Sequence, residues 1–172
     1  MKLNIKEIAV FALLGALMYS TKIVMEVLPN VHLLGVFIGA ITVVYRNKAL
    51  YPIYVYVFIN GFFSGFAMWW IPYLYIWTVL WGAVMLMPKN IPAKVKPIVY
   101  MTVCALHGFL FGTLYAPAQA LLFGLDFKGM VAWIAAGLPW DFVHGVSNFI
   151  CGTLICPIIA VLKRSEKYIT RN

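Results

Sequence analysis

The sequence predicts an all-α membrane protein, a single domain built as a bundle of six transmembrane helices. Hydrophobic residues make up 64% of its 172 positions, and charged residues only 10%. The mean hydropathy is +0.93, and apolar runs recur from one end of the chain to the other. A soluble domain of this length needs far more charge to cover its surface. We therefore expect lipid around the fold.

Charged or Gly/Pro-rich connections separate the apolar runs and define the expected helices. The first run lacks a small-residue cleavage site, so we expect a retained helix rather than a signal peptide. The second and third runs are shorter than the roughly 20 residues of a perpendicular span, so tilt, membrane thinning or flanking turns must help. Residues 127–136 are too few to cross and are expected at the surface as a lid or loop helix. The six helices are expected at about 5–27, 33–45, 49–64, 70–87, 97–123 and 139–162, within one integral membrane domain, 1–172.

The positions of lysine and arginine predict the orientation, because cytoplasmic connections carry an excess of positive charge. With six spans, all 13 basic residues except Lys22 and Lys128 fall on one side of the membrane. Five or seven spans would scatter them. We therefore expect both termini in the cytoplasm of a cell-membrane protein. The opposite connections are rich in aromatic residues, Gly and Pro, which suits a cup that opens outward.

The sequence lacks the motifs of several function classes. The net charge is +8, and the basic residues lie at the ends of apolar runs. They do not form a basic helix face with interleaved aromatics, so we expect no nucleic-acid binding. The three cysteines sit inside apolar runs without metal-ligand spacing, which favours free thiols and no metal site. No G-x-x-x-x-G-K-S/T loop is present, so the chain does not hydrolyse ATP alone. Without an H-E-x-x-H, paired-carboxylate or serine–histidine pattern, we expect no enzyme, no catalytic residue and no cofactor.

The start of the sixth helix carries the densest polar pattern. Pro139 suits a first helical turn, and Asp141 would complement the helix dipole there. Asp141, His144 and Asn148 are spaced i, i+3, i+7 and share one face, which should point to the interior or to a wet cavity rather than to lipid. One interpretation makes Asp141 a helix cap and His144 and Asn148 interhelical hydrogen-bonders. The other makes these three residues ligand contacts.

An aromatic stripe begins the fourth helix. Trp70, Tyr73, Trp77 and Trp81 recur at three- and four-residue steps. Aromatic residues near membrane ends are commonly interfacial anchors, whereas Tyr73 and Trp77 lie further in, where flat rings stack on a planar ligand. Other polar residues in or beside apolar runs are expected mostly to bond between helices, with Gln119 and Tyr115 the better site candidates. These others are His32, Asn60 and His107.

The first helix carries small residues and one charge pair. Ala9, Ala12, Gly15 and Ala16 form a small-residue stripe that allows close approach of another helix. Ordinary packing within the bundle and docking of a partner protein both explain it. Lys22 and Glu26, spaced i, i+4, are either a mutually neutralised pair or a contact for a charged ligand group.

Together these features resemble the substrate-binding (S) components of energy-coupling factor transporters, small basic six-helix proteins that import vitamins and related micronutrients in prokaryotes. The family carries Ala-x-x-x-Ala on helix 1, matched here by Ala12 and Ala16. Many members begin helix 6 with Pro-aromatic-Asp-x-x-His-x-x-x-Asn, matched from Pro139 to Asn148. The resemblance in layout covers essentially the whole chain, and the sharp motifs cover parts of two helices.

The resemblance implies an outward-facing pocket built from helices 4 to 6, and docking through helix 1 to a transmembrane coupling protein that carries two ATPases. Ala12 and Ala16 would form the coupling face. No full signature for riboflavin, thiamine, biotin or folate is present; the aromatic content favours a ring-bearing ligand. The implied pocket residues are Trp70, Tyr73, Trp77, Gln119, Trp140, Asp141, His144 and Asn148.

A self-sufficient small carrier or channel for an organic solute is the main alternative. It requires a polar path that reaches both membrane faces. The interior polar residues instead gather toward the expected outer half, apart from His107 and a few hydroxyl groups, which favours a cup with a closed bottom.

Overall fold

The computed structural model describes residues 3–169 and confirms the predicted helical class. It is 83% helix, and no strand occurs in this range. Short 3₁₀ turns, Arg46–Ala49, Met68–Trp70 and Gly152–Leu154, join some of the longer elements. The α-helices are α1 (Ile5–Met25), α2 (Leu34–Tyr45), α3 (Leu50–Ser64), α4 (Tyr73–Leu86), α5 (Lys96–Phe109), α6 (Phe111–Phe123), α7 (Phe127–Cys151) and α8 (Ile155–Ile169).

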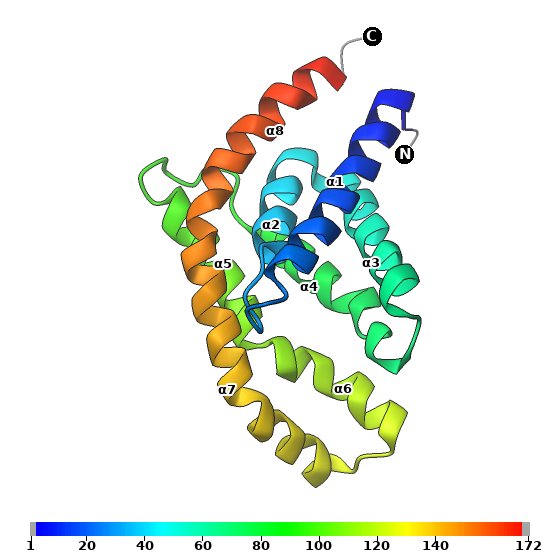
Figure 1. Cartoon of the computed structure of the whole chain (residues 1–172). Helices are drawn as coiled ribbons and strands as arrows, with labels where there is room; N and C mark the ends of the chain where they lie inside the picture. The colour runs from blue at the N-terminus through cyan, green and yellow to red at the C-terminus, as the bar shows by residue number, and fades with distance from the viewer. Residues whose placement is uncertain (1–2, 170–172) are drawn as a thin grey trace.

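Helix α2 forms the centre of the bundle. All of its residues except Val43 are buried, as expected for a helix that is apolar all round. It packs against α1, α4, α5 and α8. Helices α7 and α8 run along one whole edge of the molecule, and α6 with the first half of α7 forms a hairpin that extends away from α1 to α4 (Figure 1). The described chain begins and ends at the other end of the bundle (Figure 1).

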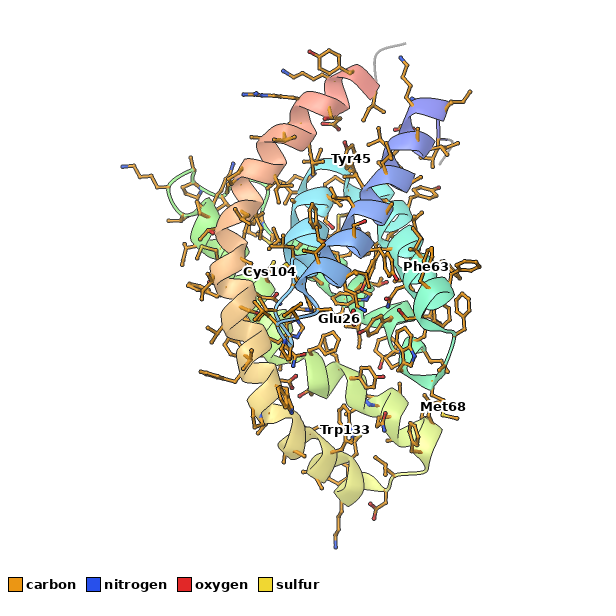
Figure 2. The ribbon with its side chains drawn as sticks, viewed as in Figure 1. Glu26, Tyr45, Phe63, Met68, Cys104 and Trp133 are labelled. Atoms are coloured by element: carbon orange, nitrogen blue, oxygen red, sulfur yellow. The ribbon has the colours of Figure 1, made fainter. Side chains whose placement is uncertain are left out.

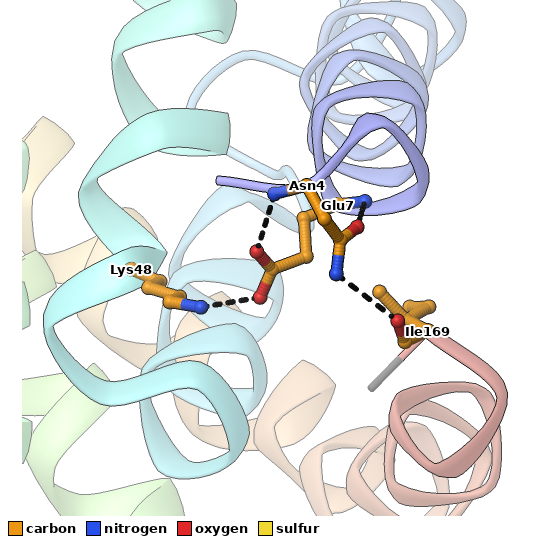
Figure 3. A network of polar contacts seen from close by, with 4 residues as sticks. All are labelled: Asn4, Glu7, Lys48 and Ile169. Atoms are coloured by element: carbon orange, nitrogen blue, oxygen red, sulfur yellow. Dashed lines mark hydrogen bonds and ion pairs between the residues drawn. The ribbon is translucent and has the colours of Figure 1, made fainter. Parts of the chain in front are cut away.

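A polar network joins the beginning of α1 to the rest of that end (Figure 3). Asn4 and Glu7 form a capping box: the Glu7 N–H donates to Asn4 Oδ1 at 2.8 Å, and the Asn4 N–H donates to Glu7 Oε2 at 3.1 Å. Such a box satisfies two amides at the helix start. Lys48 Nζ also donates to Glu7 Oε1, and Asn4 Nδ2 donates to the Ile169 carbonyl at 3.3 Å. This network therefore ties three segments together.

Within residues 3–169, four helical stretches are long and apolar enough to cross a membrane. They are Ile5–Met25, Met68–Leu86, Lys96–Phe123 and Phe127–Ile169. Helices α2 and α3, with 12 and 15 residues, fall short of the roughly 20 residues of a full span. The chain is therefore built as a membrane protein, with four of the six expected spans meeting the length requirement.

The helix expected at 97–123 is interrupted at Leu110. In a continuous α-helix the Gly112 N–H would donate to the carbonyl four residues back, but here it donates to both carboxylate oxygens of Asp141 on α7, at 3.0 Å each. Asp141 therefore caps α6 from a neighbouring helix. The interruption lets α6 turn away from the line of α5, as Figure 1 shows.

The expected helix start at Pro139 is wrong, because α7 already begins at Phe127 and contains Pro139. The segment 127–136, expected as a separate surface helix, is the first part of α7. Asp126 begins the helix by accepting the Gly129 N–H at 2.7 Å, the role of an N-cap. Toward the other end, Pro157 has no N–H to donate to the Thr153 carbonyl, and the 3₁₀ turn Gly152–Leu154 lies there.

Candidate functional site

A small cavity lies beneath the connection between α1 and α2. Its volume is about 170 Å³. Lys22 and Met25 of α1 line it, together with Glu26, which directly follows α1 (Figure 2). The connection contributes residues 28–32, and three further helices each contribute one residue. These three are Tyr73 of α4, Phe111 of α6 and His144 of α7.

The connection is held over the cavity at defined points. Asn30 adopts a left-handed backbone conformation, with φ of 58°, which asparagine tolerates better than most residues. Ser147 Oγ of α7 donates to the Asn30 carbonyl at 3.0 Å. At the rim, Lys22 Nζ donates to Glu26 Oε1 at 3.0 Å. The two side chains therefore form the mutually neutralised pair that is one interpretation of their i, i+4 spacing.

Two histidines in the wall have ring nitrogens without partners. The His32 and His144 rings meet edge to face with centroids 4.6 Å apart. His32 Nδ1 and His144 Nε2 are buried and have no hydrogen-bond partner among the described residues. Burial lowers the pKa of His32 to about 4, so this imidazole is neutral near pH 7. Buried polar atoms of this kind usually have a partner, so these two nitrogens are unsatisfied groups beside the cavity among the described residues.

Aromatic rings form the floor of the cavity. The Phe111 ring lies 4.9 Å from His144 and 5.7 Å from Trp77, centroid to centroid. Tyr73 contacts Trp77 edge to face at 5.5 Å. Trp77 is only 1% exposed and separates the cavity from the apolar core below. The site therefore combines ring faces for stacking with polar edges for hydrogen bonding.

Only some of the predicted site residues lie at the cavity. Tyr73 and His144 line the cavity, and Trp77 lies directly beneath them. Trp70 instead donates its indole N–H to the Val57 carbonyl of α3 at 2.8 Å, and Trp140 is 58% exposed on the outside of α7. Gln119 lies on α6 outside the residues that line the cavity.

Asn148 and Asp141 lie on the same face of α7 as His144 but make helix–helix contacts. Asn148 is 0% exposed, and its Nδ2 donates to the Cys104 carbonyl of α5 at 3.2 Å. Asp141 caps α6 through Gly112, as described above. Asn148 therefore matches the structural interpretation, in which it bonds between helices, whereas Asp141 caps α6 rather than the start of its own helix.

Replacing Asp141 with leucine should lower stability, because the buried Gly112 N–H loses its acceptor. We expect a loss of about 1–3 kcal/mol, the usual penalty for an unsatisfied buried donor. Asp141→Asn retains an acceptor oxygen and should lose less. Thermal unfolding of the purified protein in detergent measures both. Equal stability of wild type and Asp141→Leu would contradict the capping role.

Sequence reasoning missed two contributors to the cavity. His32 was expected to bond between helices, but its position in a connection gave no sign that the connection folds over α4 and α7. Phe111 lies in an apolar run, where nothing in the residue pattern separates a cavity-lining phenylalanine from a lipid-facing one. Lys22 and Glu26 were recognised as a pair, and the cavity lies beside them.

The small-residue stripe of α1 is divided between two faces. Gly15 is buried against α3, where an added Cβ would clash with the Val55 side chain. Ala12 is exposed and Ala16 is half-buried, and they share the outer face with exposed Leu13. One face therefore serves packing inside the bundle, and the other is open to a partner.

No protein-family model matches the chain. Neither a curated protein nor a solved structure matches it. Within residues 3–169, no group of three or more His, Cys, Asp and Glu side chains could hold a metal ion.

Proposed function

We propose that this chain is the substrate-binding subunit of an energy-coupling factor importer, which captures a vitamin or related ring-bearing micronutrient. The observation that carries the proposal is the aromatic cavity with two unpartnered histidine nitrogens, covered by a connection between helices. A transmembrane coupling protein and two ATPases supply the energy, and the subunit itself is not an enzyme. Its place is the cell membrane of a prokaryote, with both termini in the cytoplasm.

The cavity volume supports a ligand with one ring. A cavity of about 150 Å³ in a protein core is known to hold benzene, and the cavity here is about 170 Å³. His32 and His144 each offer one ring nitrogen as a hydrogen-bond donor or acceptor. A flat ring with polar atoms on its edge would stack on the aromatic floor and form hydrogen bonds with these nitrogens. A charged substituent would reach Lys22 or Glu26 at the rim.

The region below the cavity supports a binding subunit over a self-sufficient channel. Trp77, Leu80 and Ile41 are essentially inaccessible to solvent and belong to the hydrophobic core of the bundle. A channel needs polar groups along its whole length. A closed-bottomed cup instead requires movement of the protein, driven by partners, to release its ligand on the other side.

The small molecule that accompanies the purified protein tests the proposal. We expect mass spectrometry of gently purified protein to find a single-ring heteroaromatic compound. Adding that compound to the ligand-free protein should change tryptophan fluorescence, because Trp77 lies beneath the cavity. A coupling protein and ATPases should co-purify from native membranes. Solute flux through vesicles that contain this chain alone would instead support the carrier or channel.

A further inference from the structure

A second, larger cavity lies far from the aromatic site, at the end of the bundle where the described chain begins and ends. Its volume is about 540 Å³. It is enclosed by α2, the last turn of α4, the connection to α5, and α8. Four basic side chains line it: Arg46, Lys89, Lys96 and Lys163.

The charge of this cavity is unbalanced. Of the described residues, four cationic side chains and no carboxylate contribute to its lining. Lys96 and Arg46 are half-buried, whereas Lys89 and Lys163 are exposed. Like charges gathered around a partly desolvated space repel one another more strongly than in water. An anion in the cavity relieves this repulsion.

Arg46 is held in place by its neighbours. Its backbone is left-handed, with φ of 52°, an uncommon conformation for a residue other than glycine. Its guanidinium donates from Nη2 to the Met85 carbonyl at 3.1 Å, and its own carbonyl accepts the Trp81 indole N–H at 3.1 Å. A guanidinium has five N–H donors, so several remain for a ligand. Little side-chain freedom is lost when an anion binds to it.

The remaining walls are apolar. Val43, Val84 and Ile159 line the cavity beside the basic groups, and they come from three different helices. A free inorganic ion gains nothing from contact with apolar walls. A lipid, in contrast, places its phosphate among the cations and its first methylene groups against the apolar side chains. Basic pockets between membrane helices bind anionic headgroups in this way.

We propose that this cavity binds the headgroup of an anionic phospholipid. The phosphate lies among Arg46, Lys89, Lys96 and Lys163, and the acyl chains leave along the apolar walls. The site is independent of the aromatic cavity and of the transport role. A bound lipid would link α2, α8 and the α4–α5 connection, and so stabilise this end of the bundle.

Two variants with the same change in charge test the proposal. Lys89→Gln/Lys96→Gln/Lys163→Gln removes three cavity charges and leaves Arg46 and its structural bonds intact. Lys94→Gln/Arg164→Gln/Lys167→Gln removes three charges from neighbouring segments, outside the residues that line the cavity. Native mass spectrometry with phosphatidylglycerol measures lipid affinity, and phosphatidylcholine is the neutral comparison. Inorganic phosphate and glycerol phosphate, as competitors, separate a lipid site from a site for a free anion.

The cavity variant should bind phosphatidylglycerol about a hundredfold more weakly, at about 1 kcal/mol for each lost cation. The matched variant should lose less than about fivefold, the share of a single charge. Equal loss in both variants would overturn the proposal, because general surface charge would then explain binding. Full displacement of the lipid by inorganic phosphate would also overturn it. The proposal would likewise be overturned if the cavity variant kept its affinity for phosphatidylglycerol but lost the binding of a protein partner. Thermal unfolding in phosphatidylcholine checks that both variants are folded.

Discussion

Replacing Ala12 and Ala16 together with leucine is expected to abolish uptake while the protein still folds and binds its ligand. Ala12 is exposed and Ala16 is half-buried on α1, and lipid at the exposed face accommodates larger side chains. A partner helix that approaches closely over small residues does not accommodate them. Overpacking costs about 1–3 kcal/mol per site, so association with the coupling protein should fall by roughly tenfold to a hundredfold or more. Co-purification and uptake in cells measure the effect.

The chain contains a matched control for this experiment. Ala132 and Ala136 have the same four-residue spacing and are exposed on α7. Replacing this pair with leucine should leave uptake unchanged. Full uptake by the Ala12/Ala16 variant would refute the docking face, and so would an equal loss in both variants. Gly15 is unsuitable as a control because it packs against α3.

Replacing His144 with phenylalanine is expected to weaken ligand binding by roughly tenfold to a hundredfold. Phenylalanine fills the space of the imidazole but offers no nitrogen to the ligand, so a polar group on the ligand loses its partner at a cost of about 1–3 kcal/mol. The protein should remain folded, because His144 Nε2 has no hydrogen-bond partner among the described residues. Titration of the identified ligand, followed by tryptophan fluorescence or calorimetry, measures the change.

Trp140 provides the comparison for His144. It belongs to the same run of residues in the sequence, but its side chain is directed outward on α7. Trp140→Phe should therefore bind the ligand as the wild type does. If Trp140→Phe weakened binding and His144→Phe did not, the ligand would lie elsewhere and the assigned cavity would be wrong.

The polar pattern of α7 illustrates how far sequence reasoning reaches into the site. Spacing at i, i+3 and i+7 predicts a shared face, and Asp141, His144 and Asn148 are all buried. The spacing does not reveal what each residue meets. Seven residues of helix extend about 10 Å along its axis, so the three side chains lie at different depths and meet different neighbours. Only His144 of the three lines the cavity.

The helical class follows from composition and pattern, because any chain this apolar must satisfy its backbone polar groups internally when it lies in lipid. The concentration of basic residues near the ends of the apolar runs follows from the cost of burying charge. The caps at Asn4 and Asp126 are local contacts, because each side chain accepts an amide N–H only three residues away, although neither cap was among the predictions.

The break at Leu110 and the covered cavity depend instead on partners distant in the chain. Asp141 and Gly112 are 29 residues apart, and Ser147 and Asn30, whose bond holds the connection over the site, are 117 apart. No local preference brings such groups together. Packing of whole helices around α2 does so, and that packing determines which polar side chains bond between helices and which line the cavity.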